Sequence, residues 1–167
     1  FRICPQGVLF GNGGPTLYTD FNEDEVLAFL NTKVSAYILK LLNPTINCTK
    51  SDIEKLPIVF ESNLNIKSIV QDNIAISRYD WDSHETSWDF QRNPLWEQQL
   101  DIILDEMRER GVFSEDATID DIGPFNLPDL LQPLELLVEN YQSEWEDLFH
   151  QLHRNEEELN RKFIEIY

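Results

Sequence analysis

The densest group of side chains that could do chemistry lies between residues 80 and 89. It contains four carboxylates and one imidazole: Asp80, Asp82, His84, Glu85 and Asp89. Carboxylates beside a histidine can hold a hard metal ion or carry protons. Two tryptophans interleave with them, however, and no second histidine lies nearby in the sequence. We therefore predict an ordered loop over residues 79–94 that Trp81 and Trp88 anchor on the body of the protein, with no metal site and no catalytic residue.

A second stretch, Phe10-Gly11-Asn12-Gly13-Gly14, has the glycine content of a cofactor loop. Its spacing fits neither the dinucleotide-binding nor the phosphate-binding glycine pattern, and no helix is expected directly after it. A plain turn is the better interpretation, and it predicts no cofactor in this chain.

The net charge of −18 is unevenly distributed. Residues up to Phe90 carry 7 Lys/Arg and 12 Asp/Glu, whereas those from Gln91 onward carry 6 and 19. Such a surface repels phosphate, so the charge argues against autonomous binding of nucleic acid. Any contact with DNA must come from a local patch in the first half.

Cys4 and Cys48 are too few for a disulfide framework and are not spaced as a metal pair. The sequence shows no export signal and no apolar run long enough for a transmembrane helix. It predicts a cytoplasmic protein with no membrane partner. The chain starts at Phe1 and stops within a periodic apolar pattern, which we interpret as a fragment of a larger protein.

The first half predicts short β segments at residues 1–4, 7–10 and 16–18, with a brief strand at 58–60. A helix is expected from 23 to 42, bent near Asn31-Thr32 and ended by Asn43-Pro44. The positions expected to face the core on this helix are Val34, Ile38, Leu41 and Leu42. A short helical turn at 51–56 and a helix at 63–77 follow.

The second half predicts a helix over 95–110, stopped by Gly111, and a loop over 112–133. The final helix, 134–166, carries a coiled-coil seam of Leu134, Val138, Tyr141, Trp145, Leu148, Leu152, Leu159 and Ile166. We expect the two helices to pair as an antiparallel hairpin. The predicted fold class is α+β, mainly helical, with domains at 1–94 and 95–167.

On the 23–42 helix, Lys33, Tyr37 and Lys40 share one face, and a polar stretch follows Pro44. Lysines on one face can meet phosphates, and Asn is the natural bidentate reader of adenine. The candidate DNA-binding residues are Lys33, Tyr37, Lys40, Asn43, Thr45, Asn47, Thr49, Lys50 and Lys55. The alternative is a solvated helix face followed by a capping turn.

The sequence Asn43-Pro44-Thr45-Ile46 resembles the catalytic Asn-Pro-Pro-aromatic motif of amino-methyltransferases, in which the aromatic ring stacks on a flipped base. Thr45 and Ile46 replace the second proline and the ring, so that chemistry cannot run here. Helix termination is the favoured interpretation, and a contact loop is the alternative.

Short sequence motifs spread over most of the chain resemble the PglX family, the adenine-specific methyltransferases of BREX phage-defence systems. They are Leu30-Asn31-Thr32-Lys33-Val34, Leu41-Leu42-Asn43-Pro44-Thr45, Asp52-Ile53-Glu54-Lys55-Leu56-Pro57-Ile58, the 80–90 segment and the 155–167 tail. Residues 112–133 contain none of these shared motifs.

This resemblance implies a parent protein that transfers a methyl group from S-adenosylmethionine to adenine N6 in double-stranded DNA. It also implies that the present chain is a non-catalytic target-recognition or scaffold segment following the catalytic domain, whose motifs it lacks. The alternative is a docking module for other phage-defence proteins without direct DNA contact.

Overall fold

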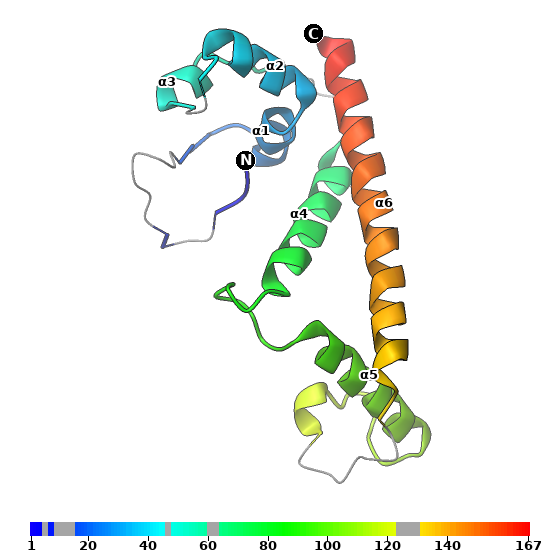
Figure 1. Cartoon of the computed structure of the whole chain (residues 1–167). Coiled ribbons are helices and arrows are strands. Elements are labelled where there is room, and N and C mark those ends of the chain that lie inside the picture. Colours follow the sequence, from blue (N-terminus) through cyan, green and yellow to red (C-terminus); the bar gives the residue numbers. More distant parts are fainter. Residues whose placement is uncertain (5–6, 9–15, 46–47, 60–63, 123–130) are drawn as a thin grey trace. The chain divides into compact units, whose positions relative to one another are not determined.

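The computed structural model describes residues 1–4, 7–8, 16–45, 48–59, 64–122 and 131–167 (Figure 1). The helices are α1 (Glu23–Leu30), α2 (Lys33–Leu42), α3 (Lys50–Ile53), α4 (Lys67–Asp82), α5 (Pro94–Glu109), the 3-10 helix η1 (Ile119–Asp121) and α6 (Leu134–Ile166). Among these described residues there is no strand, so the predicted α+β class is wrong.

In two of the predicted β segments, backbone groups bond to side chains and not to a neighbouring strand. The amino group of Phe1 donates to Asn31 Oδ1 at 3.0 Å, and Asn31 Nδ2 donates back to the Phe1 carbonyl at 3.2 Å. The amide of Val59, in the predicted 58–60 strand, donates to Tyr167 Oη at 3.0 Å. Short strands need neighbours to be stable. Residues 9–10 and 60 of these predictions lie outside the described residues.

The single helix expected from 23 to 42, bent near Asn31-Thr32, is two separate helices that meet at those residues. Asn22 caps α1 by accepting from the Asp24 amide at 3.0 Å. Thr32 caps α2, its hydroxyl accepting from the Ser35 amide at 3.3 Å. A side-chain acceptor at the first turn satisfies an otherwise unpaired helix donor. The α2 helix ends at Leu42, before Asn43-Pro44 as predicted.

The chain forms two compact units, each built from separated stretches of sequence. Unit 1 comprises Phe1–Ile76 with His150–Tyr167, and unit 2 comprises Ser77–Phe149. Both α4 and α6 contribute residues to each unit. The expected domains at 1–94 and 95–167 stay a prediction.

The core of unit 1 brings the two ends of the chain together. Phe29 of α1 is fully buried, its ring centroid 5.7 Å from that of Phe163 and 5.4 Å from that of Tyr167. Leu159 joins the same cluster from α6. On α4, Asn73 Oδ1 accepts from Asn155 Nδ2 at 2.8 Å. The last turns of α6 therefore complete the core of the N-terminal helices.

Unit 2 has a smaller buried set, formed by Leu100, Ile103 and Leu104 of α5 and Leu137 of α6. The Oε1 atom of buried Gln99 accepts from the Gln132 amide at 2.9 Å and so ties the start of α6 to α5. Gly111 has a φ of +70° and ends the α5 segment, as predicted. The pairing of α5 with α6 as a hairpin stays a prediction.

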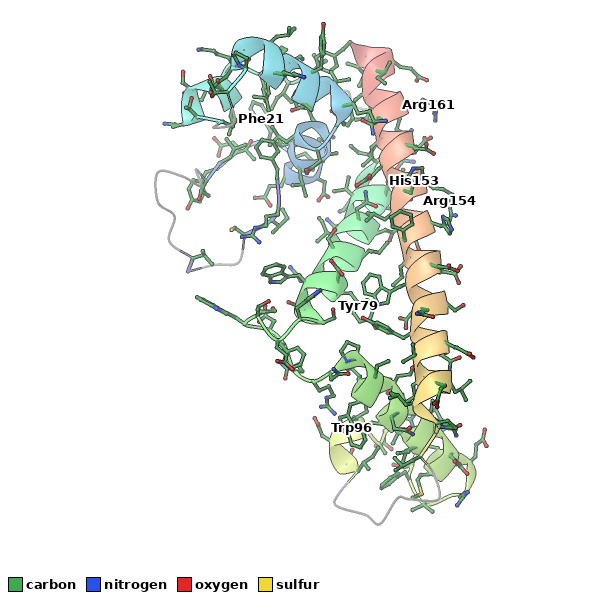
Figure 2. All side chains as sticks on the ribbon, viewed as in Figure 1. Phe21, Tyr79, Trp96, His153, Arg154 and Arg161 are labelled. Carbon is green, nitrogen blue, oxygen red and sulfur yellow. The ribbon has the colours of Figure 1, made fainter. Side chains whose placement is uncertain are left out.

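The α4 helix also packs on α6, a pairing that the sequence did not predict. Within unit 2, Tyr79 of α4 stacks on Trp145 of α6, with ring centroids 5.3 Å apart and planes within 8°. Figure 2 labels Tyr79 where it projects from α4. Burial and then the Glu144 carboxylate raise the pKa of Tyr79 to about 12, so its phenol remains protonated.

Candidate nucleic-acid interface

The α2 helix exposes the three side chains that were predicted from the sequence to face DNA. Lys33, Tyr37 and Lys40 all lie on its exposed surface, and 66% of Tyr37 is accessible. The Lys33 amide donates to Asn160 Oδ1 at 2.7 Å, which fixes the start of α2 against α6 within unit 1. The Lys33–Tyr37–Lys40 stripe is therefore carried on an anchored helix.

The opposite face of α2 packs on the core, but not through all the predicted positions. Val34, Ile38 and Leu39 are half-buried against the cluster, and Ser35 is fully buried. Leu41 and Leu42 are 67% and 42% exposed, so their prediction as core residues was wrong. Both lie in the last turn of α2.

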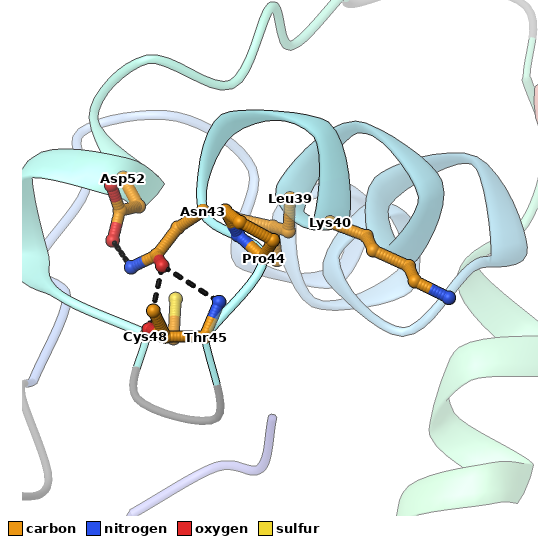
Figure 3. Close-up of a pocket in the computed structure, with 7 residues that line it drawn as sticks. All are labelled: Leu39, Lys40, Asn43, Pro44, Thr45, Cys48 and Asp52. Atoms are coloured by element: carbon orange, nitrogen blue, oxygen red, sulfur yellow. Dashed lines mark hydrogen bonds between the residues drawn. The ribbon is translucent and has the colours of Figure 1, made fainter.

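A pocket of about 300 Å³ lies where α2 ends and α3 begins (Figure 3). It is lined by Leu39, Lys40, Asn43, Pro44, Thr45, Cys48 and Asp52. Three of these, Lys40, Asn43 and Thr45, were candidate DNA-binding residues. The structure thus places the end of the basic stripe beside the polar loop expected to follow it.

Asp52 organises this pocket, although it is not among the candidate residues predicted from the sequence. Its Oδ2 atom accepts three hydrogen bonds: from Asn43 Nδ2 at 2.8 Å, the Thr49 amide at 2.9 Å and Thr49 Oγ1 at 2.7 Å. These bonds, the one from Asn43 first, lower the pKa of Asp52 to about 2. The spacing of Thr49 and Asp52 is the capping-box pattern, so the signal was present in the sequence.

The amide of Asn43 is used within the chain. Besides donating to Asp52, it accepts through Oδ1 from the Thr45 amide at 3.0 Å and from Thr45 Oγ1 at 2.6 Å. Asn43 therefore connects the end of α2, the loop after Pro44 and the start of α3. In this arrangement its polar atoms hold the loop in shape.

The remaining candidates are exposed in the same region. Thr45, Thr49, Lys50 and Lys55 lie on the surface. Lys50 Nζ is 3.3 Å from Glu54 Oε1, and 79% of the lysine side chain remains accessible. Asn47 lies outside the described residues. The DNA-contact role of the whole set stays a prediction.

The pocket offers no activated nucleophile. Its thiol belongs to Cys48, and burial together with the Asp52 carboxylate raises the pKa of that thiol. A protonated thiol is a poor nucleophile and metal ligand. Over the ranges that the structure describes, no group of three or more His, Cys, Asp and Glu side chains could hold a metal ion.

The 80–89 segment differs from the anchored loop that was predicted. The α4 helix continues to Asp82, and a turn follows in which Ser87 Oγ donates to Asp82 Oδ1 at 2.7 Å. Trp88 is 95% exposed, so its ring does not anchor the segment on the protein, and Trp81 is 53% exposed. The buried side chain is Ser87, which is 8% exposed.

Within the described part of the chain, no helix is both long and apolar enough to cross a membrane. No family model matches this chain, and no solved structure matches it.

Two curated proteins are similar to it in sequence. The adenine-specific methyltransferase PglX of Lacticaseibacillus casei (strain Zhang) is 31% identical over 168 residues, which cover 99% of this chain and 12% of that protein. The adenine-specific methyltransferase BrxX of Escherichia coli O9:H4 (strain HS) is 35% identical over 100 residues, which cover 58% of this chain and 8% of that protein.

The chain therefore spans about a tenth of the length of these relatives. The similarity to PglX extends over nearly the whole chain, as the motifs shared with the PglX family predicted. This chain is related to one segment of the PglX and BrxX adenine-specific methyltransferases of BREX type.

Proposed function

We propose that this chain is a non-catalytic DNA target-recognition segment of an S-adenosylmethionine-dependent adenine-N6 DNA methyltransferase that acts in phage defence. The relatives supply the class of enzyme. The observation that carries the DNA-binding part is the exposed Lys33–Tyr37–Lys40 stripe, which ends at a polar loop held by Asn43 and Asp52.

The spacing of the stripe suits a nucleic-acid backbone. Lys33 and Lys40 are seven residues apart on one helix, which separates them by about 10.5 Å along its axis. Both can meet phosphates of one strand, and the exposed Tyr37 between them adds a hydroxyl donor. Such contacts position a protein on DNA without reading sequence.

The loop beyond α2 is suited to the reading of base edges. Thr45 and Thr49 are exposed there, and Asn43 and Asp52 hold the loop from within. Because Asp52 receives three hydrogen bonds, its negative charge is compensated by donors of the protein rather than presented to a phosphate. Hydroxyls can bond to any base edge, so discrimination would also draw on Asn47.

The distribution of charge between the two units also favours unit 1 as the part that binds DNA. Unit 1 carries 9 Lys/Arg and 12 Asp/Glu, whereas unit 2 carries 4 and 19. The near-balanced unit is the one that holds the stripe. DNA would approach unit 1 against much weaker repulsion than unit 2.

The test is charge reversal in the full-length methyltransferase. Lys33→Glu with Lys40→Glu should weaken binding to duplex DNA of every sequence and lower the salt slope by roughly 0.9 per lost phosphate contact. Asn47→Ala should act preferentially on the target sequence, by about 1–3 kcal/mol for a lost base contact.

A matched control reverses two exposed cations of unit 1 outside this surface, Lys67 and Arg154. Figure 2 shows Arg154 projecting from α6. The double variant Lys67→Glu, Arg154→Glu changes the net charge equally but should leave the salt slope unchanged. If the two double variants behave alike, or if neither alters binding, α2 does not contact DNA.

A further inference from the structure

The turn after α4 exposes more aromatic surface than folding requires. Trp88 is 95% exposed, and Trp81, at the end of α4, is 53% exposed. Burial of a large aromatic side chain stabilises a fold, so a tryptophan left in water forgoes that stabilisation. We name residues 80–89 the tryptophan turn.

The tryptophan turn has a defined shape, because its backbone is tied to the end of α4. The Ser83 hydroxyl donates to the Asp80 carbonyl at 2.7 Å, and the Ser87 amide donates to the His84 carbonyl at 2.9 Å. Buried Ser87 then accepts from the Asp89 amide at 3.1 Å. Trp88 is thus presented between two fixed neighbours, which lowers the entropy that its burial by a partner would cost.

The charge around these rings is strongly negative. Between residues 77 and 97 there are five acids and two arginines, and Arg92 is paired with Asp120 at 3.0 Å. Asp80, Glu85 and Asp89 lie on the surface of the turn itself. Unit 2 as a whole carries a net charge of −15.

We propose that the tryptophan turn is a docking surface for an arginine-rich segment of a partner protein. A guanidinium can stack on an indole face and at the same time donate two parallel hydrogen bonds to a carboxylate. Tryptophan and arginine are also both enriched among the residues that dominate binding energy at protein interfaces. The charge of unit 2 excludes nucleic acid as the occupant and disfavours a second copy of the same unit.

The test uses the 167-residue chain and a fluorescent synthetic peptide in which arginine alternates with serine. Fluorescence anisotropy should show binding, and Trp88→Ala should weaken it about tenfold or more, with Trp88→Phe retaining most of the affinity. A lysine–serine peptide of equal charge should bind more weakly, since an ammonium lacks the planar stacking face. Because Trp88 is exposed, the variants should keep the helical content of the wild type.

Tyr18→Ala is the matched control, since Tyr18 is an aromatic residue that is 89% exposed in unit 1. It should bind the arginine peptide as the wild type does. Equal affinity of Trp88→Ala and wild type would overturn the proposal, because binding would then depend on bulk charge alone. It would also be overturned by the absence of binding, or by sedimentation showing that Trp88 mediates self-association of the chain.

Discussion

At the scale of single residues, Asp52 shows how one carboxylate can organise a loop. It joins the end of α2 to the start of α3 through three accepted hydrogen bonds, and its pKa is about 2 against an ordinary 3.8. Because the folded pKa is the lower one, the ionised group stabilises the fold above about pH 4. That contribution is lost as the pH falls from about 4 through about 2.

Asp52→Asn should therefore lower the melting temperature by about a few degrees at pH 5, and the difference from wild type should shrink toward pH 2. Thermal melts followed by circular dichroism at several pH values measure this. Asp20→Asn, which changes an exposed acid outside the pocket, is the control. A constant difference for Asp52→Asn at all pH values would mean that the hydrogen bonds do not favour the ionised form.

Ser35 is a second residue whose role only its environment reveals. It is fully buried in α2, and its hydroxyl has no hydrogen-bond partner among the residues that the structure describes. An unsatisfied buried polar group is unfavourable, and alanine is the better helix former. Ser35→Ala should stabilise the chain by about 0.5–1 kcal/mol in urea unfolding. Exposed Ser77 of α4 is the control, because Ser77→Ala gains helix propensity only, and an equal gain would contradict the argument.

At the scale of elements, the last turns of α6 are part of the core of unit 1. Phe163 is 1% exposed and packs on Phe29, whereas its neighbour Ile164 is 59% exposed. Phe163→Ala should lower the free energy of unfolding by about 3–5 kcal/mol, whereas Ile164→Ala should change it by no more than about 0.5 kcal/mol. Chemical unfolding of the two variants compares them directly. Similar values would show that the C-terminal turns do not pack on α1.

The register of α6 gives a further test at this scale. The predicted seam began at Leu134, but Leu134 is 62% exposed and Leu137 is 5% exposed. An aspartate at a buried position leaves an unpaired charge away from water. Leu137→Asp should therefore lower the free energy of unfolding by several kcal/mol and reduce the melting temperature, whereas Leu134→Asp should leave the melting temperature nearly unchanged. The opposite order would restore the predicted seam.

At the scale of the whole molecule, net charge should limit what the chain does alone. With a charge of −18 and only a local basic stripe, it should bind duplex DNA no better than the weak non-specific range of about 10⁻⁴ M. A gel-shift titration at physiological salt checks this. Nanomolar, sequence-selective binding would mean that this chain recognises DNA without the rest of a methyltransferase.

Much of the helical framework could be predicted from local chemistry alone. Asn22, Thr32, Gly111 and the Asn43-Pro44 pair act on their own neighbours through capping, positive φ or steric exclusion, so the breaks at these positions follow from sequence. The exposed stripe on α2 and the relationship to PglX were also readable, since each depends on the order of residues and not on their packing.

Only the tertiary structure decided which apolar residues are covered. Residues 1–4 and 58–60 looked like strands, but strands require partners, and the Phe1 amino group and the Val59 amide bond to Asn31 and Tyr167 instead. Trp88 looked like an anchor because tryptophan is usually buried, yet hydrogen bonds of Ser87 hold the turn with the ring outside. Periodicity states which residues share a face of a helix, and burial depends on contacts made far along the chain, such as that of Phe163 with Phe29.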